Sequence, residues 1–599
     1  MKKSIFIILV AYFCLEVYAA LSPSQKSWLS VTDTEPTVAD TTGYLIVSTP
    51  KYREPIKKFM EWKRTLGFLV DTLLLNSNPL TNTQVLDSIQ NRYNQNHHLA
   101  YLLIVGTIAD IPTFSKRPEL YTGLFDYNDH YQSGEWEHST DYDYGLVSQS
   151  NDIPLLKRGR IPVATAAEAD TVFDKIISYE KTPVMDENFY NRGLHIAQFQ
   201  DETNDYYEDY RFTLTSEEIR NFMLGKGKQI DRFYTGPTPE NTILHWNHTV
   251  YASGQEVPDS VASLFGSPSA EIVSNKINEG AMYVLYYDHG NNYRWEHPRF
   301  NTLSILGLTN GDKQPLVISC CCHTGDFSSS THFASTFLKK SGGGAIGVIA
   351  STNVILTGFS DSMLEGIFSS IWPENGIAVD SLNQTDLNSV NYTNRTAYRL
   401  GDILDSGLSV MKQQFDSIEL HGLNNIVATG DTVTNMCIYA SEIFHLIGDP
   451  TMELRTTVPQ PVATPTVNLV NSNHHVTTTD GDARISFYNV TTGAVCSYLG
   501  STAGYACNSG DKVKVSLTRP NYIPYIAEVG GDIYIQNETI LGGRFYRGGN
   551  IYVGKDVTST KDSGEVVFRS GSETTFRGGT VKLDKGTTIE LGAKVNISH

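Results

Sequence analysis

The amino-acid sequence predicts an α/β fold with a parallel sheet, followed by strand-rich modules. Between residues 43 and 455, apolar strands without polar alternation alternate with helical patterns, which is typical of a parallel sheet covered on both faces. After residue 458 the helical patterns stop and short alternating strands begin. From residue 529 the strands are punctuated by Gly. A chain of 599 residues is also too long for one hydrophobic core.

The first α/β subdomain is predicted over residues 43–190. Its strands are GYLIVST, FLVDTLLL and AYLLIVG, and the segments between them have helical spacing of apolar residues. The second of these helices has Thr81 or Asn82 near its N-cap. Strands joined in this way by helices form parallel pairs.

The second subdomain is predicted over residues 191–456 and repeats the same pattern. Its strands are GLHIAQF, AMYVLYY, LVISCCC and GGAIGVIAS, with a helix predicted from SEEIRNFMLGKG. The join between the subdomains is expected near residues 183–191.

Two β-rich modules are predicted after a Pro-rich linker. Residues 457–528 contain runs such as ARISFYNV and KVKVSLTR and suit a small β-sandwich. Residues 529–599 suit a small unit of stacked β-repeats. Cys496 and Cys507 lie close in sequence and form either a disulfide or two free buried thiols.

The N-terminus and the overall charge limit the possible functions. Residues 1–19 combine two lysines with a short apolar run and predict a signal peptide, followed by a linker or pro-segment at 20–42. No other stretch is apolar enough to span a membrane. The net charge of −19 argues against a broad nucleic-acid interface and is typical of a solvated acidic surface.

Two strand ends carry residues suited to nucleophilic catalysis. The strand AMYVLYY is followed by Asp288, His289 and Gly290, and LVISCCC ends at Cys322. The carboxyl ends of parallel strands share one edge of a sheet, so the two side chains can meet there. An imidazole can take the proton of a thiol and later protonate a leaving amine. The amides of Gly290 and Cys322 are candidate donors to an oxyanion.

Cys322 is the expected nucleophile among three consecutive cysteines. It is nearest the end of the strand, whereas Cys320 and Cys321 are expected to be buried as small apolar residues. Strand alternation puts Cys321 on the face opposite its two neighbours. Consecutive cysteines do not suit a tetrahedral zinc site.

Several motifs resemble those of the gingipain family of caspase-like cysteine peptidases. His289-Gly290 is followed by Trp295 and Phe300, and Cys322 is followed two residues later by Gly-Asp-Phe. The segments AYLLIVG, DYDYG, GRIPV, GGAIGVIAST and HLIGDP are also similar to gingipain segments. The resemblance covers about residues 43–455. It implies a caspase-like domain of two α/β subdomains, proteolysis through a Cys–His dyad, and an immunoglobulin-like sandwich at 457–528.

The chain departs from the gingipain pattern at the third catalytic position. Arginine-specific gingipains have a Glu where this chain has Gln200. The resemblance therefore implies Asp201 as the acid that orients the imidazole, with a register shift of one, or alternatively Asp288. The chain also has Asp288 where gingipains often have Gly, and Cys321 where they usually have Ala.

The resemblance further implies a set of binding residues. Those expected at the substrate are Asp209, Trp295, Ser351 and Thr352. Gingipains bind calcium, and the loop QDETNDYYED offers oxygen ligands from Asp201, Asp205 and Asp209, or else is simply a solvated acidic loop. The chemistry itself requires no cofactor.

The predicted function is a secreted cysteine endopeptidase that cleaves protein or peptide substrates at the cell surface or outside the cell, with cleavage after basic residues suggested. The alternative is a catalytically inert surface adhesin that binds through its C-terminal β-modules. A third interpretation, a peptidase that processes specific partners, is not separated from the first by the sequence.

Overall fold

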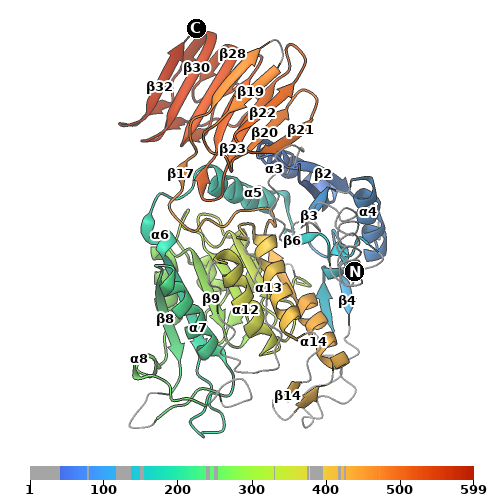
Figure 1. Ribbon diagram of the computed structural model, residues 1–599, viewed down its shortest axis with the longest axis vertical. Coiled ribbons are helices and arrows are strands. Elements are labelled where there is room, and N and C mark those ends of the chain that lie inside the picture. Colours follow the sequence, from blue (N-terminus) through green and yellow to red (C-terminus); the bar gives the residue numbers. More distant parts are fainter. Residues whose placement is uncertain are drawn as a thin grey trace, which may run out of the picture.

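The computed structural model describes residues 41–598, apart from 77–79, 97, 117–136, 149–153, 238–242, 248–253, 330, 374–376, 378–395, 416–419, 424–425, 429 and 471–472. The predicted signal peptide and almost all of the predicted pro-segment lie outside the described residues. Figure 1 shows an α/β body with a strand-rich C-terminal part stacked on one end of it. Among the helices of the described residues, none is long and apolar enough to cross a membrane.

One sheet of ten strands runs through the whole α/β body of the described chain. In spatial order its strands are β2 (Leu69–Leu74), β1 (Gly43–Ser48), β3 (Leu99–Val105), β6 (Lys157–Ile161), β16 (Phe444–Ile447), β13 (Gly347–Ser351), β12 (Leu316–Cys320), β9 (Tyr283–Tyr287), β7 (Arg192–Gln198) and β8 (Gln229–Thr235). The two predicted subdomains therefore share one continuous sheet instead of forming separate sheets.

The sheet is not parallel throughout, and this corrects the prediction. All of its neighbouring strands pair in parallel except β13 and β16, which are antiparallel. The five strands on one side of that pairing thus run opposite to the five on the other. As a consequence, only β13, β12, β9, β7 and β8 end at the edge that holds His289 and Cys322.

Helices cover both faces of this sheet. Along β1, Tyr44 and Ile46 pack into a large core with α3 and α5, whereas Leu45 and Val47 pack on the other face with α4. This two-sided burial explains the continuous apolar strands in the sequence. The helices with more than one turn are α3 (Arg53–Thr65), α4 (Asn82–Gln95), α5 (Ala166–Lys181), α7 (Phe212–Gly225), α9 (Ala270–Glu279), α11 (Phe333–Lys339), α12 (Phe359–Ile371), α13 (Leu400–Phe415) and α14 (Gly430–Ile443).

Local sequence signals fix several of these helices. The N-cap of α4 is Thr81, whose hydroxyl accepts a bond from the Gln84 amide while the Gln84 side chain accepts one from the Thr81 amide. This reciprocal pair satisfies two amides at the start of the helix. Thr165 caps α5 in a similar way, by accepting a bond from the Glu168 amide.

The C-terminal part begins as two facing sheets. One sheet contains β18 (Thr466–Val470), β19 (Asn473–Thr477) and β22 (Thr502–Ala506). The other begins with β21 (Val495–Leu499), β20 (Arg484–Asn489), β23 (Val513–Thr518) and β25 (Tyr525–Val529). A shared core that includes Val476, Phe487 and Val515 lies between them, as a β-sandwich requires.

The last module consists of stacked parallel strands. β28 (Gly543–Val553), β30 (Glu573–Leu583) and β32 (Lys594–Ser598) pair in parallel, as do β27 (Glu538–Ile540), β29 (Val566–Phe568) and β31 (Thr587–Ile589). β26 (Ile533–Ile535) joins β28. Because β25 pairs with β28, one eight-stranded sheet runs through both modules, so the predicted boundary at residue 529 does not separate two sheets.

Polar contacts fix the sandwich against the end of α3. The hydroxyl of Ser516 donates to the carbonyl of Thr65 over 2.5 Å, and that of Ser497 donates to the carbonyl of Gly67 over 2.9 Å. Lys514 pairs with Glu61 at 2.8 Å. The serines thereby satisfy carbonyls that the helix end leaves without partners.

Smaller elements complete the structure. These are η1 (Pro50–Tyr52), β4 (Phe114–Lys116), β5 (His138–Thr140), η3 (Tyr142–Gly145), α6 (Glu187–Asn191), α8 (Asp259–Ala262), β10 (Gly290–Asn291), β11 (Arg294–Trp295), α10 (Thr302–Leu306), β14 (Leu420–Leu423), β15 (Ile426–Ala428), β17 (Gln460–Pro461) and β24 (Tyr522–Ile523).

Candidate active site

His289 and Cys322 follow two neighbouring parallel strands at the same level. β9 and β12 are paired so that Tyr287 lies beside Cys320. His289 is two residues beyond Tyr287, and Cys322 is two residues beyond Cys320. Both residues are partly exposed, whereas the strands before them are buried. The two side chains therefore leave the sheet at one edge, next to each other in strand order, as the sequence predicted.

The imidazole of His289 is held from a third strand. Its Nε2 atom lies 2.6 Å from Oε1 of Gln200, which follows β7 on the other side of β9. Its ring also meets the rings of Tyr210 and Phe212 edge to face, with centroids 5.9 and 5.5 Å away. Such aromatic edges restrict ring rotation through packing.

The bond to Gln200 fixes the protonation pattern of a neutral imidazole. An amide oxygen only accepts hydrogen bonds, so Nε2 of His289 carries the proton and donates it to Gln200. The other nitrogen, Nδ1, is then the basic one. Gln200 is 6% exposed, so this bond is shielded from competition with water.

The thiol of Cys322 is uncharged in this arrangement. Burial raises the pKa of the Cys322 thiol, and the amides of Ile355 and of Cys322 itself counteract this rise by hydrogen bonding to the sulfur. The charge of Asp288 raises the pKa further. A neighbouring base is therefore needed to generate a thiolate at neutral pH.

The turn after Cys322 is tightly bound to the rest of the sheet edge. His323 has a positive φ of 60°, and its amide donates to the carbonyl of Asn353 over 3.1 Å. The amide of Gly325 donates to Ser351 over 2.8 Å, and a Cβ at Gly325 would lie 2.9 Å from the backbone of Ala350. Only Gly allows this approach without displacing β13.

Asp326 and Phe327, which follow Gly325, connect the cysteine turn to neighbouring segments. Asp326 accepts a bond of 3.1 Å from the side chain of Asn292, in the hairpin that begins at Gly290. The ring of Phe327 is buried against His445 and under the guanidinium of Arg160. The Gly-Asp-Phe motif thus connects the cysteine turn to the histidine hairpin and to the core.

The other cysteines have structural surroundings. Cys320 and Cys321 are fully buried, as predicted, and burial raises the pKa of both thiols. Cys321 packs under Gly290, where a Cβ would meet its sulfur at 2.6 Å. Cys496 and Cys507 are not joined by a disulfide, so the disulfide alternative is wrong, and the sulfur of Cys507 lies 3.0 Å from Nε2 of His474.

The amide of Gly290 points away from its own hairpin. Gly290 is paired with Trp295 in β10 and β11, but the Trp295 amide donates to Phe300. The carbonyl of His289 accepts a hydrogen bond of 3.1 Å from the amide of Glu296, so Gly290 and Trp295 form a non-hydrogen-bonded pair. In such a pair the two backbone amides point away from the partner strand, and this is the direction of the Gly290 amide.

Neither predicted acid orients the imidazole of His289. The carboxylate of Asp201 accepts bonds of 3.0 Å from the amides of Asp205 and Tyr206, so it closes its own loop. Asp288 contacts the backbone amide of His289 and not its ring. The orienting residue is Gln200, at the position where the sequence comparison had already placed the family's Glu.

Trp295, Ser351 and Thr352 are not placed to bind substrate, which corrects the prediction. Trp295 is fully buried, stacked on Tyr286 with centroids 4.4 Å apart. Ser351 and Thr352 are also buried, and their hydroxyls donate to the carbonyls of Asn353 and Ile443. These residues were inferred from motifs whose structural role lies in the core.

Asp209 lies beside the site, whereas the acidic loop is closed on itself. The Asp209 amide donates to the carbonyl of Gln200 over 2.8 Å, and its carboxylate accepts from the amide of Glu202. Asp205 caps the amide of Tyr207. Within the described residues no three His, Cys, Asp or Glu side chains are placed to hold one metal ion. Calcium binding by this loop stays a prediction.

Sequence reasoning missed several residues of the site. Tyr210 and Phe212 flank the imidazole, Ile355 donates to the sulfur, and Asn292 bridges the two motifs. Nothing in the local sequence of Ile355 or Asn292 indicates these contacts, which depend on the pairing of distant segments. The aromatic pair of Tyr210 and Phe212, at the start of α7, was the only available signal.

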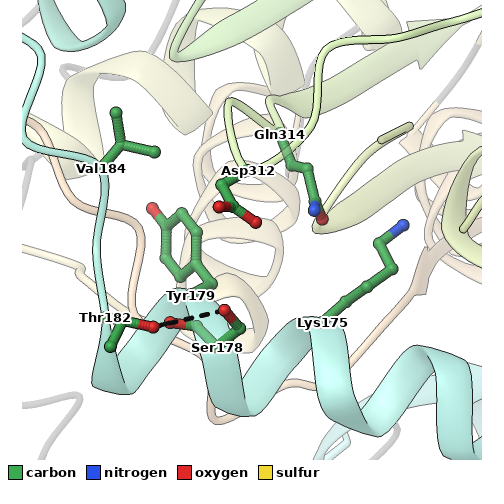
Figure 2. Close-up of a pocket in the computed structure, with 7 residues that line it drawn as sticks. All are labelled: Lys175, Ser178, Tyr179, Thr182, Val184, Asp312 and Gln314. Carbon is green, nitrogen blue, oxygen red and sulfur yellow. Dashed lines mark hydrogen bonds between the residues drawn. The ribbon is translucent and has the colours of Figure 1, made fainter. Parts of the chain in front are cut away.

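A small polar pocket lies at the other end of β12, away from these residues. Figure 2 shows Lys175 and Tyr179 on α5 facing Asp312 and Gln314, which precede β12. The ammonium of Lys175 donates to carbonyls at the end of α11, at 2.8 Å from that of Leu338 and 3.0 Å from that of Lys340. Burial lowers the pKa of Lys175 to about 7. The pocket therefore holds a buried amine, but it lies apart from the strand ends that carry His289 and Cys322.

The family of the chain follows from a match over most of its α/β body. A family model described as peptidase family C25 matches residues 37–455. The chain belongs to peptidase family C25. The Lys-gingipain W83 of Porphyromonas gingivalis is 23% identical over 290 residues, and a second Lys-gingipain of that species is 21% identical over 292 residues. Each match spans 47% of this chain but only 14% of the relative.

Solved structures of the C25 family share the fold. The crystal structure of the Arg-specific cysteine proteinase gingipain R has a TM-score of 0.60 and 18% identity, covering 84% of this chain and all of that one. A complex of the pro- and mature domains of Porphyromonas gingivalis RgpB gives a TM-score of 0.58 and 16% identity over 81% of this chain and 99% of that one. The predicted gingipain-like α/β fold is therefore confirmed.

Proposed function

We propose that this C25 chain is a secreted cysteine endopeptidase in which Cys322 and His289 form the catalytic dyad. The observation that carries this proposal is the register of β9 and β12, which puts the two residues at one level on one sheet edge. The bond from His289 to Gln200 adds to it, because it leaves Nδ1 as the basic nitrogen.

The reaction would begin with transfer of the Cys322 thiol proton to Nδ1 of His289. The sulfur then attacks the carbonyl carbon of the scissile peptide, and the resulting oxyanion accepts bonds from the amides of Gly290 and Cys322. The imidazolium next protonates the leaving amine, which breaks the C–N bond and leaves a thioester. A water deprotonated by His289 hydrolyses the thioester and restores the thiol.

The proposed substrate preference rests on charge, and the proposed export rests on the N-terminal sequence pattern. Asp209 beside Gln200 and the net charge of −19 support protein or peptide substrates cleaved after basic residues. The relatives named for Lys and Arg specificity are consistent with that preference. Export is supported by the signal-peptide pattern of residues 1–19.

Hydrolysis of a peptide library by the purified chain tests the proposal. The variants Cys322→Ala and His289→Ala should lose activity by at least about a thousandfold, since each removes one partner of the dyad. Cys496→Ala is the matched control, because it removes a half-buried thiol from the tail. Turnover retained in Cys322→Ala would refute the proposed dyad. Ligand binding by a chain that never hydrolyses peptides would support the inert adhesin instead.

A further inference from the structure

A buried network surrounds the backbone of His289. Asp288 is 1% exposed, and its Oδ1 accepts a bond of 2.6 Å from the amide of His289. The hydroxyl of Tyr286 lies 2.6 Å from the carbonyl of His289 and 3.1 Å from Oδ2 of Asp288. The peptide groups on both sides of His289 are thus fixed by Asp288 and Tyr286.

One solvent-facing residue completes this network. Nδ1 of His297 lies 3.2 Å from Oδ2 of Asp288, and the His297 side chain is 39% exposed. The hydrogen bond with Asp288 raises the pKa of His297, with further support from the charges of Asp288 and Glu296 and opposition from burial and Arg299. Glu296 is itself paired with Arg294 at 2.9 Å. Asp288 is therefore the main anion that His297 meets.

The charge of Asp288 reaches the nucleophile. Asp288 directly follows β9 and Cys321 directly follows β12, so the two residues continue the register of a neighbouring pair. The carboxylate of Asp288 raises the pKa of the thiols of both Cys321 and Cys322. A buried carboxylate beside a thiol opposes thiolate formation unless a cation compensates it.

We propose that Asp288 and His297 form a positioning pair for the dyad, in which the carboxylate fixes the backbone of His289 and the His297 imidazolium screens that carboxylate from the sulfur of Cys322. His297 is a positioning residue, since it acts through Asp288 and touches no reacting atom. The mechanistic consequence rests on the proposed function, but the effect on the thiol does not. Screening is present while His297 is protonated and is lost as the pH rises through its raised pKa.

The reactivity of Cys322 toward iodoacetamide tests the pair directly. Labelling of the peptide that contains Cys322 is followed by mass spectrometry from pH 5.5 to 9 in a Cys496→Ala/Cys507→Ala background. His297→Gln, which keeps a donor but has no charge, should label about three- to tenfold more slowly than the parent near pH 6. The two rates should converge toward the alkaline end of this range, as the pH rises above the raised pKa of His297 and the parent loses that charge.

The partner variant should have the opposite effect. Asp288→Asn keeps an acceptor for the His289 amide but removes the negative charge, so it should label faster than the parent at pH 7. Adding His297→Gln to Asp288→Asn should change the rate less than twofold, because no charge remains to be screened. A rate loss in both single variants, or an equal loss at all pH values in His297→Gln, would overturn the proposal.

Peptide hydrolysis separates this proposal from the proposed function. If the labelling shifts occur but the parent hydrolyses no peptide, the pair stands and the peptidase assignment fails. If hydrolysis depends on Cys322 while labelling is indifferent to His297, the pair fails and the peptidase assignment stands. If the Asp288–His297 pair and the peptidase activity are both confirmed, His297→Gln should lower kcat near pH 6 and leave KM within about twofold of the parent.

Discussion

Replacing Gln200 with Ala should weaken catalysis without unfolding the chain. Gln200 is buried, and its Oε1 atom makes the 2.6 Å bond that selects the Nε2-protonated form of His289. Ala removes that acceptor, so the imidazole can rotate between its aromatic neighbours or adopt the other tautomer. Either change takes the basic nitrogen away from the thiol.

The expected loss follows from the strength of one buried hydrogen bond. A neutral hydrogen bond of this kind contributes about 0.5–1.5 kcal/mol. At the upper end, which suits a short and shielded bond, that energy corresponds to a fall in kcat/KM of about tenfold. The loss should appear in kcat, since Gln200 contacts the base and not the substrate.

A carboxylate at the same position should restore the orientation and change the pH dependence. Gln200→Glu keeps an acceptor at the imidazole and adds a negative charge, which favours the protonated form of His289. The acid limb of the kcat/KM profile should therefore move to higher pH, because the base must lose a proton before it can act.

Steady-state hydrolysis of a cleavable peptide between pH 5 and 9 provides the measurement. Glu202→Gln is the matched control, because Glu202 is an exposed residue of the same loop, and it should stay within twofold of the parent. A Gln200→Ala variant as active as the parent, with unchanged unfolding by urea, would refute the role of Gln200. If Gln200→Glu is active but the acid limb of its kcat/KM profile stays at the pH of the parent, the electrostatic part of the reasoning is refuted.

Other predictions follow from packing and burial. Gly290→Ala should lower kcat/KM at least about tenfold, because its Cβ would lie 2.6 Å from the sulfur of Cys321, and adding Cys321→Ala should recover part of the loss. Trp295→Phe should lower the urea-unfolding free energy by about 1–3 kcal/mol through its lost indole bond, with KM within twofold; a large rise in KM would show substrate contact instead. Burial lowers the pKa of His195 and His445 to about 3, so they bind protons only when unfolded between pH 6.5 and 3. The free energy of unfolding therefore falls as the pH falls through that window. Replacing either histidine with Gln should reduce the fall in unfolding free energy between pH 7 and 5 by roughly 2 kcal/mol. An unchanged dependence of the unfolding free energy on pH would contradict this account.

The sequence could predict that His289 and Cys322 follow neighbouring strands because both residues coincide with recognisable strand ends. The apolar runs before His289 and Cys322 are long enough to be recognised as buried strands, and their residue types suit thiol catalysis. What the strand pattern could not give was the partner of His289. A choice between Gln200 and Asp201 depends on a one-residue register at the end of β7, and loop hydrogen bonds decide it.

The errors in the predicted substrate site have a common physical cause. A match to a family motif shows which residue type occupies a position, but it does not show where the side chain points. Trp295 comes five residues after Gly290, but the hairpin directs its ring inward, onto Tyr286 and toward β12. Ser351 ends β13, which is buried along its whole length, and Thr352 follows it, so their hydroxyls bond to the backbone. Sheet direction was missed for a similar reason, because apolar content does not distinguish an antiparallel β16 from a parallel one.

Three other motifs of the family resemblance, GRIPV, DYDYG and HLIGDP, form buried ion pairs away from His289 and Cys322. Arg160 in GRIPV holds Asp141 in DYDYG through bonds of 2.6 and 2.9 Å, beside the point where β6 meets β16. Asp449 in HLIGDP pairs at 2.7 Å with Lys63 of α3, which also binds Glu180 of α5 at 2.6 Å.

These buried charges lie on the β16 side of the antiparallel pairing, where they connect β6 and the end of β16 with α3 and α5. Removing one member would leave its partners charged without compensation, which costs about 3–5 kcal/mol. On its other side, β16 pairs antiparallel with β13. Since β13 supplies the carbonyl that holds Gly325 in the cysteine turn, these ion pairs support the geometry of Cys322 from a distance, through β16 and β13.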